Sequence, residues 1–223
     1  MECGGHAGRH GAVENKLSGI RSDGSRAASL SCLCVEDGCL ESKLFPIPGP
    51  VLFTPPKFGD LRGFNSEVYN QRTFESLIGT VHFVQDNHSL SVQQGTIRGL
   101  HFQAQPSAQG KLVRVARGAI FDVAVDIRRS SPTFGRHISA ILSAENWSQL
   151  WVPIGFAHGF CTIEPNTEVI YKVTDFYSNA DDKGIAWNDP DIGIEWPVTP
   201  GAAIISERDT AHPRLSESPA YFD

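Results

Sequence analysis

Long apolar runs are absent from this sequence of 223 residues. None approaches the roughly 18 to 20 consecutive apolar residues that a membrane-spanning helix needs. The N-terminus lacks the charged-then-apolar order of a signal peptide, so we expect a cytoplasmic protein with no membrane partner. Basic residues show no excess, since 19 Lys and Arg stand against 25 Asp and Glu. This balance argues against a nucleic-acid partner, and an anionic small ligand would have to meet basic residues gathered locally.

Cysteine is scarce after the first forty residues, where only Cys161 occurs. Cys3, Cys32, Cys34 and Cys39 all lie near the N-terminus, and "CLCVEDGC" has C-x-C-x4-C spacing. Such spacing can serve a zinc site, but there is no matched second pair and no nearby group of histidines. Reduced thiols in a loose tail are therefore the favoured interpretation. Cys161, in "HGFCTI", is expected to be an apolar-like core residue.

The chain divides into two parts of different pattern. Residues 1–45 are rich in Gly, Ser, Arg and Ala and show no sustained hydrophobic period, so we expect a disordered N-terminal extension. Residues 46–223 contain short β-like runs with turn residues about every eight to twelve positions. This spacing is typical of a sandwich, jelly roll or small barrel. One all-β domain is therefore predicted over residues 46–223.

Two segments give the clearest local predictions. In "IFDVAVDIR", Val123 and Val125 alternate with Asp122, which predicts a strand with one buried side. Only "YNQRTFESLIG" has a helical pattern, with Gly79 placed to end a short peripheral helix. Residues 187–213 are heavy in Pro and Gly and should wrap the core as an ordered loop.

The stretch "GTIRGLHFQ" carries polar residues along a predicted strand. Strict alternation places Gly99, His101 and Gln103 on one face, and Arg98 and Leu100 on the other. If the first face looks into the domain, His101 and Gln103 line a cavity. A single core histidine bonded to a backbone carbonyl is the ordinary alternative, but the neighbouring inward polar residues favour the cavity.

The segment "VPIGFAHGF" resembles the P-x-G-x-x-H half of a cupin metal signature, with His158 as its histidine. The other half matches at Gly95 and His101 but then fails. Gln103 stands where a second histidine belongs, and Ser107 stands near the place of the glutamate. Two imidazoles without a carboxylate are a poor ligand set for zinc or non-haem iron. We therefore expect a cupin pocket without metal, and a metal-dependent oxygenase is disfavoured.

Such a pocket suits proton abstraction next to a ketone. That reaction needs a base of near-neutral pKa, a cation facing the developing oxyanion, and an acid. His101 can be the base, Lys111 the cation and Tyr171 the acid. Tyr171 shares its face with Val169 and Val173, so on spacing alone a core tyrosine is the slightly favoured interpretation.

A family resemblance rests on eight segments in matching order and spacing: "FGDLRGF", "FVQDNHS", "RGLHFQ", "QGKLVR", "FDVAVDIRRSSPTFG", "LSAENWSQLWVPIGFAHGF", "YKVTDFYS" and "WNDPDIGIEWP". From about Val51 onward the sequence resembles the dTDP-4-dehydrorhamnose 3,5-epimerase family, which makes an L-rhamnose precursor. The resemblance implies a cupin-like jelly-roll barrel that works as a homodimer without metal or cofactor. It also implies an isomerase that inverts C3 and C5 of dTDP-4-dehydro-6-deoxy-D-glucose, giving dTDP-4-dehydro-L-rhamnose.

The resemblance also assigns roles to residues. His101 is implied as the base, Asp209 as the group that orients its imidazole, Lys111 as the cation and Tyr171 as the acid. A carboxylate on one ring nitrogen fixes the tautomer and raises the basicity of the other nitrogen. Further contacts with a dTDP-linked 4-keto-6-deoxy sugar, with Arg62 reaching across the dimer, are implied for Arg62, Glu67, Gln85, Asp86, Asn87, Arg98, His158, Asp182 and Arg208.

Departures from the family pattern concern binding more than chemistry. The segment "FNSEVYN" is more polar than the usual version, Asp182 is shorter than the expected glutamate, and Arg208 replaces an expected lysine. Two other functions stay open: a relative that inverts only one carbon, and a non-catalytic cupin that binds a sugar nucleotide. The matched base and acid argue against the second, because a binding module needs neither.

Overall fold

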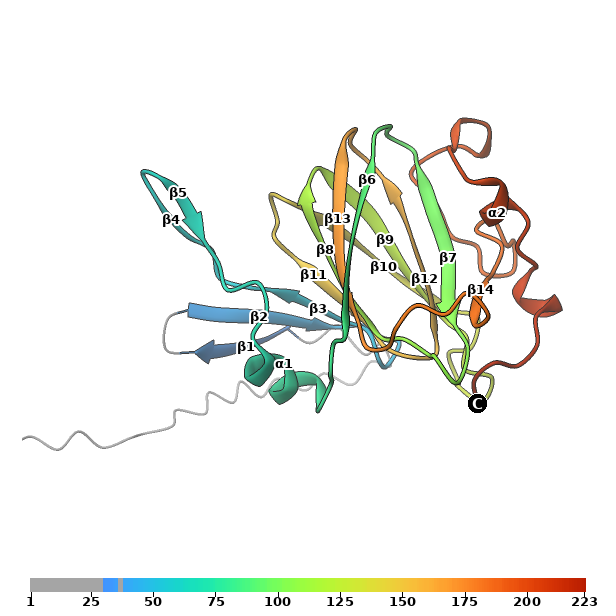
Figure 1. Cartoon of the computed structure of the whole chain (residues 1–223), viewed down its shortest axis with the longest axis horizontal. Helices are drawn as coiled ribbons and strands as arrows, with labels where there is room; N and C mark the ends of the chain where they lie inside the picture. The colour runs from blue at the N-terminus through green and yellow to red at the C-terminus, as the bar shows by residue number, and fades with distance from the viewer. Residues whose placement is uncertain (1–29, 36–37) are drawn as a thin grey trace, which may run out of the picture.

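Two facing β-sheets form the body of the protein (Figure 1). The computed structural model describes residues 30–35 and 38–223, with side chains from Leu40 onward. The larger sheet has seven strands, in the spatial order β1 (Leu30–Val35), β2 (Gly38–Leu44), β3 (Val51–Thr54), β11 (Gln149–Val152), β8 (Lys111–Arg117), β13 (Thr167–Val173) and β6 (Gln85–Ser91).

The smaller sheet has five strands, and a separate hairpin projects from the body (Figure 1). The all-β class is confirmed, but hydrogen bonds among the described strands form open sheets, so the expected barrel is not closed. In spatial order the five strands are β10 (His137–Ser143), β9 (Ala119–Asp126), β12 (Phe156–Thr162), β7 (Ile97–Gln103) and β14 (Asp182–Gly184), and the hairpin is β4 (Phe58–Asp60) with β5 (Gly63–Asn65).

Both faces of the smaller sheet are buried. Ile120 and Ala124 of β9 pack between the sheets with Val113 of β8. Val123 and Val125 pack on the outer side against residues of the C-terminal segment. The prediction that β9 has only one buried side is therefore wrong, because the C-terminal segment covers the outer face of the sheet.

The C-terminal segment wraps the smaller sheet as an ordered chain, as its composition predicts. It pairs with the body through two isolated bridges, Thr96 to Ile204 and Arg128 to Phe222. Its three short helices are η1 (Pro200–Ala202), α2 (Glu207–Thr210) and η2 (Leu215–Glu217). The wrap thus brings α2 to the edge of the space between the sheets.

The predicted peripheral helix is α1 (Gln71–Ile78). Asn70 caps it by accepting the backbone N–H groups of Arg72 and Thr73, and Gly79 ends it with φ of 98°. Phe74 is its buried residue and contacts the Phe53 and Trp151 rings. In the part of the chain that the structure describes, no helix is long and apolar enough to cross a membrane.

Strands β1 and β2 lie within residues 1–45, which were expected to be disordered. Strand β2 pairs with β3, and Leu40 packs with Phe53 and Phe74, so this part of the expectation is wrong. Residues 1–29 and 36–37 lie outside the described residues, as do the side chains of the cysteines in the possible zinc pattern. Cys161 is fully buried as predicted, and burial raises the pKa of its thiol to about 11.

A β-bulge in β7 determines which side chains of this strand face the cavity between the two sheets. His158 of β12 pairs with His101, but Phe160 pairs with Arg98, so β7 contains one extra residue over this interval. Arg98 and His101 consequently face the same cavity, whereas Leu100 packs in the outer core. The strict alternation predicted for Arg98 is wrong for this reason.

Gly99 is the residue that permits the bulge. Its φ is 138°, and a Cβ at this position would lie 2.6 Å from the Cα of Gly159 on the neighbouring strand. Any other L-residue would therefore meet both an unfavourable dihedral and a backbone contact.

We predict that Gly99→Ala lowers the free energy of unfolding by more than the about 1–3 kcal/mol expected for dihedral strain alone. Gly63→Ala is the matched control, because Gly63 has φ of 134° but nothing within 4 Å of the added Cβ. Urea denaturation measures both. Equal losses in the two variants would show that the contact with Gly159 does not determine the cost.

Candidate active site

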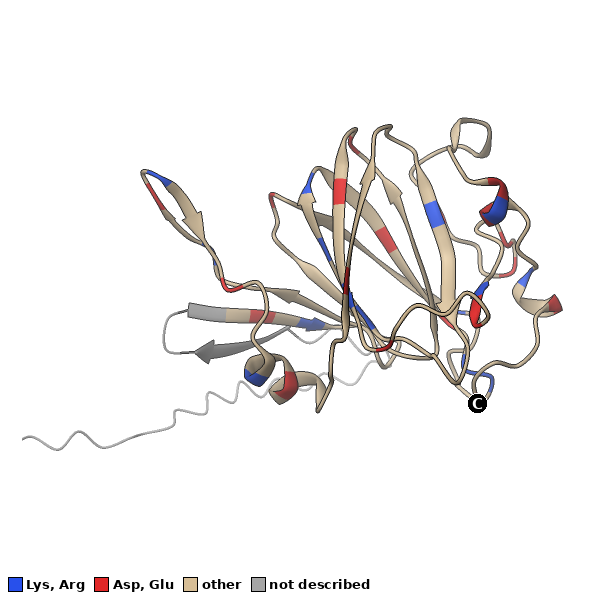
Figure 2. Cartoon of the chain, in the orientation of Figure 1, with Lys and Arg blue, Asp and Glu red and all other residues tan. Residues whose placement is uncertain are grey.

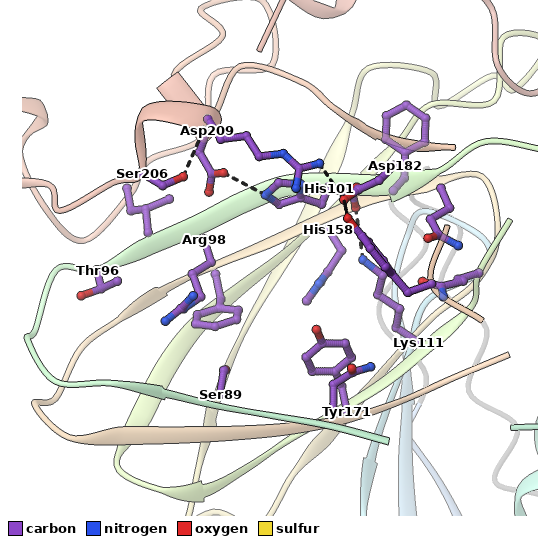
Figure 3. Close-up of a pocket in the computed structure, with 18 of the residues that line it drawn as sticks. Ser89, Thr96, Arg98, His101, Lys111, His158, Tyr171, Asp182, Ser206 and Asp209 are labelled. Carbon is purple, nitrogen blue, oxygen red and sulfur yellow. Dashed lines mark hydrogen bonds and ion pairs between the residues drawn. The ribbon is translucent and has the colours of Figure 1, made fainter. Parts of the chain in front are cut away.

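A cavity of about 620 Å³ lies between the two sheets (Figure 3). This volume is in the range of small-molecule sites. Strands of both sheets and the C-terminal segment contribute its walls. Its polar lining includes Gln85, Asn87, Arg98, His101, Gln103, Lys111, His158, Tyr171, Tyr177, Asp182, Arg208 and Asp209.

His101 and Asp209 form an imidazole–carboxylate pair at the edge of the cavity (Figure 3). Asp209 Oδ1 lies 3.1 Å from His101 Nε2, and the Gly99 N–H donates to Oδ2 at 3.1 Å. Ser206 caps α2 by accepting the Asp209 N–H, which fixes the backbone of the aspartate. Because a carboxylate only accepts, His101 carries its proton on Nε2, and Nδ1 is the basic nitrogen.

A second carboxylate faces the basic nitrogen of His101. Asp182 Oδ1 lies 3.8 Å from Nδ1, beyond hydrogen-bond distance. Its other oxygen accepts from Arg208 at 2.6 Å and from the Tyr177 hydroxyl at 3.0 Å. The imidazole therefore lies between two carboxylates, one bonded to it and one held back by other donors.

These contacts set the charges of the site. Burial alone would lower the pKa of His101, but Asp182 and Asp209 outweigh burial and raise it above its usual value. Burial alone would raise the pKa of Asp209, but the hydrogen bonds with His101 and Gly99 bring it down to about 2. The pKa of Asp182 is also held well below its usual range, against the effect of burial, by the nearby His101 imidazole and by the hydrogen bond with Arg208. Both carboxylates are thus ionised beside a strengthened base.

Lys111 and Tyr171 enter the cavity from the larger sheet, opposite His101 (Figure 3). Lys111 Nζ donates to the backbone oxygen of His101 at 3.3 Å. Burial lowers the pKa of Lys111 to about 8, with Asp182 and Asp122 opposing this effect. Burial also raises the pKa of Tyr171. At neutral pH the lysine is therefore a cation and the tyrosine a proton donor.

His158 forms a second buried pair, with a partner that the sequence analysis did not select. Asp122 Oδ1 lies 2.6 Å from His158 Nε2, and the Asp122 side chain is fully buried. The signal was present, because Asp122 alternates with apolar residues in "IFDVAVDIR" and faces inward once both faces are buried. The pair places a fixed imidazole on the floor of the cavity.

Gln103 stands at the cupin position of a metal-binding histidine and holds two loops instead. Its amide NH₂ donates to the backbone oxygens of Ser107 and Phe176, and its oxygen accepts the Ser178 N–H at 2.7 Å. Tyr177, which the sequence analysis also missed, lies on the second of these loops. The amide therefore positions the donor that restrains Asp182.

The predicted nucleotide contacts separate into two groups. One group lines the cavity together with His101, Lys111, Tyr171 and Asp209: Gln85, Asn87, Arg98, His158, Asp182 and Arg208. Asp86 does not line it; its carboxylate binds Lys172 at 3.0 Å on the other side of the sheet. Arg62 and Glu67 also lie outside the cavity, and Arg62 pairs with Asp60 on the projecting hairpin, where Figure 2 shows both charges.

The arrangement supports proton transfer at a carbon acid. A base lies on one wall, and a cation and a hydroxyl donor lie on the opposite wall. Arg98 and Arg208 supply positive charge at the rim for an anionic ligand.

We predict that Asp209→Asn lowers the pKa of His101, because a neutral amide no longer stabilises the imidazolium form. The pKa is measured by NMR titration of the ring protons. Glu168→Gln is the control, since it removes a half-buried carboxylate that lies 3.1 Å from His88 and does not line the cavity. An unchanged His101 pKa in Asp209→Asn would contradict the role of this carboxylate.

Comparisons with known proteins agree with this geometry. A model of the dTDP-4-dehydrorhamnose 3,5-epimerase family matches residues 45–217. The dTDP-4-dehydrorhamnose 3,5-epimerase of Sinorhizobium fredii is 55% identical over 171 residues, which is 77% of this chain and 87% of that protein.

Solved structures share the fold. The dTDP-4-dehydrorhamnose 3,5-epimerase of Bacillus anthracis, with TDP and PPi bound, has a TM-score of 0.74 and 51% identity, covering 77% of this chain and 97% of that chain. An epimerase of Legionella pneumophila in complex with dTDP-4-keto-L-rhamnose has a TM-score of 0.75 and 40% identity, covering 86% and 96%. With its sequence, its fold and its cavity in agreement, this chain belongs to the dTDP-4-dehydrorhamnose 3,5-epimerase family.

Proposed function

We propose that this chain is an isomerase that converts dTDP-4-dehydro-6-deoxy-D-glucose to dTDP-4-dehydro-L-rhamnose by inverting C3 and C5. The observation that carries the proposal is the placement of His101 and Tyr171 on opposite walls of one cavity. Inversion requires that a proton leave from one face of the sugar and return to the other. Two opposed groups, one basic and one acidic, provide this.

The proposed reaction begins with His101 Nδ1 taking the proton from a carbon next to the C4 ketone. The electron pair of the broken C–H bond forms a double bond from that carbon to C4, and the π pair of the carbonyl moves onto the C4 oxygen, which gives an enolate. The Lys111 ammonium stabilises that oxyanion, and Asp209 stabilises the imidazolium. Tyr171 then donates its proton to the carbon from the opposite face, and solvent restores both groups.

One set of groups can act at both centres, because C3 and C5 are each adjacent to the same carbonyl. The ketone oxygen would stay near Lys111 while the ring moves to present the second carbon. The raised pKa of His101 favours abstraction, and the raised pKa of Tyr171 keeps its proton available.

Binding of the nucleotide is proposed for the rim of the cavity. A guanidinium binds phosphate oxygens in a fork, which suits Arg98 as a diphosphate contact. Gln85 and Asn87 lie nearby on β6 and would contact the thymidine side. Arg62 on the hairpin and Glu67 just after it lie outside the cavity of their own chain, so we propose a homodimer in which this exposed segment completes the partner's site.

The catalytic unit is proposed to be residues 46–223, although strands β1 and β2 extend its sheet. A cytoplasmic location stays a prediction of the sequence. A relative that inverts a single carbon would use the same base and acid, so the number of exchanged centres distinguishes it. A non-catalytic binding cupin would exchange neither.

We predict that the protein incorporates deuterium at both C3 and C5 when it is incubated in D₂O with dTDP-4-dehydro-6-deoxyglucose. The hydrogens next to the ketone are replaced from solvent each time an anion is reprotonated. Mass spectrometry counts the deuterium and NMR locates it. Label at one carbon would identify a single-centre epimerase, and no label would contradict the proposed function.

We predict that Tyr171→Phe slows epimerisation more than it slows exchange, because His101 can still remove and return a proton on its own face. His101→Ala is the paired variant and should reduce both by about 10²–10⁴-fold or more, with nucleotide binding largely kept. If Tyr171→Phe left both rates unchanged, the acid would be another group.

A further inference from the structure

His212 lies against the catalytic pair but has no part in the proposed reaction. Its ring meets that of His101 edge to face, with centroids 5.1 Å apart and an interplanar angle of 87°. Its Nε2 is buried and has no hydrogen-bond partner among the described residues. A buried imidazole nitrogen without a partner loses its hydration without compensation.

The fold makes room for this ring at Gly184. Gly184 pairs with His101 across β14 and β7, and a Cβ on Gly184 would overlap the His212 ring. The imidazole therefore occupies space that any other residue at position 184 would fill. It is held beside the pair by packing and not by a hydrogen bond of Nε2.

His101, Asp209 and His212 each offer a metal-binding atom, and these three atoms lie within 4.8 Å of one another. In a tetrahedral zinc site with ligand bonds of about 2.0–2.2 Å, neighbouring ligand atoms are about 3.3–3.5 Å apart. His101 Nε2 and Asp209 Oδ1 are already 3.1 Å apart. A shift of His212 by at most about 1–1.5 Å reaches that spacing, and the Asp209 carboxylate must turn off the N–H axis of His101 to leave room for the metal on the Nε2 lone pair.

We propose that this cluster is an inhibitory site for Zn²⁺ and related divalent transition metals. Two imidazoles, a carboxylate and one water form a four-coordinate ligand set that zinc accepts. This cluster differs from a cupin metal site, which would combine His101 and His158 with ligands near positions 103 and 107. The proposed cluster combines His101 with Asp209 and His212 of the C-terminal segment.

Metal binding would inhibit proton abstraction by His101, because the metal coordinates the imidazole and its carboxylate partner. The metal takes the lone pair of His101 Nε2 once the proton there is released to solvent, and it takes the carboxylate that stabilised the imidazolium. A cationic metal on Nε2 also weakens Nδ1 as a base. Inhibition therefore rests on the proposed role of His101, whereas metal binding does not.

Nearby charges permit a cation here. Arg208 precedes Asp209 on α2, and its guanidinium is bound to Asp182 at 2.6 Å. The Asp209 carboxylate lies 3.1 Å from His101 Nε2 and provides an oxygen ligand beside the two imidazoles.

The test measures metal binding and exchange activity separately in the full chain. Co²⁺ titration, followed by the visible absorption of tetrahedral cobalt, reports binding without activity, and Zn²⁺ should displace the cobalt. The D₂O exchange rate with and without Zn²⁺ reports inhibition. The comparison uses the ratio of the two rates, so a change in basal rate in a variant does not matter.

His212→Asn is expected to weaken cobalt binding and zinc inhibition by about 10- to 100-fold or more, since loss of even a supporting group commonly costs that much. His212→Ala serves as a second variant. His88→Asn is the matched control, because it removes an imidazole that pairs with Glu168 far from the cluster. A variant with Cys3, Cys32, Cys34 and Cys39 replaced by Ser removes the four N-terminal thiols, which are also able to bind zinc.

The proposal requires that sensitivity and the cobalt spectrum persist in the cysteine variant and in His88→Asn, and that both weaken in His212→Asn. Equal inhibition of His212→Asn and the parent chain would overturn it. Loss of both signals in the cysteine variant would also overturn it, by placing the metal on the thiols. Cobalt binding that depends on His212 but leaves exchange unaffected would keep the binding site and refute the inhibition.

Discussion

The site depends on one extra residue in strand β7. The bulge at Gly99 reverses the alternation between Arg98 and His101, so the proposed diphosphate contact and the proposed base face the same cavity from one strand. It also turns the Gly99 N–H toward Asp209, and this bond fixes the carboxylate that orients His101. A regular strand would send one of the two side chains into the outer core and leave Asp209 without this donor. Gly159 is the complementary feature, because the two backbones approach too closely for side chains there.

Around this bulge, the chemistry is set by how buried charges are distributed. An isolated ion in the interior is costly, so each one needs a partner. His101 has two carboxylates, and the raised pKa that results makes it a stronger base. Lys111 has no direct carboxylate bond and instead donates to a backbone oxygen, so burial dominates and its pKa falls to about 8. A buried lysine without a carboxylate partner is stabilised more by a developing oxyanion than a lysine that is already paired. The ligand then supplies the negative charge that the protein does not place beside the ammonium.

Much of this could be predicted from the sequence, and the exceptions have physical causes. The all-β class, helix α1 and the grouping of His101, Lys111, Tyr171 and Asp209 follow from alternation, capping residues and family motifs. The orientation of Arg98 did not, because a bulge leaves no reliable mark in the hydrophobic period. Asp122 was missed because the period of β9 shows one polar and one apolar face but not what covers each. The C-terminal segment covers the apolar face, so the polar face with Asp122 lies between the two sheets. Arg62 lies on the hairpin and Glu67 follows it before α1, so neither residue lines the cavity of its own chain.

The same geometry that makes a good base also makes a good half of a metal site. A carboxylate that lies 3.1 Å from an imidazole nitrogen offers two ligand atoms already near the spacing that zinc needs. Two ligands alone hold a metal weakly, so a metal-free enzyme can keep such a pair as long as no third donor comes close. In this chain Gly184 admits the ring of His212 to that position. In the proposed inhibition, Gly184 decides whether a metal competes with the proton on His101, because it leaves the space that the His212 ring fills. Gly184 itself takes no part in the proton transfer.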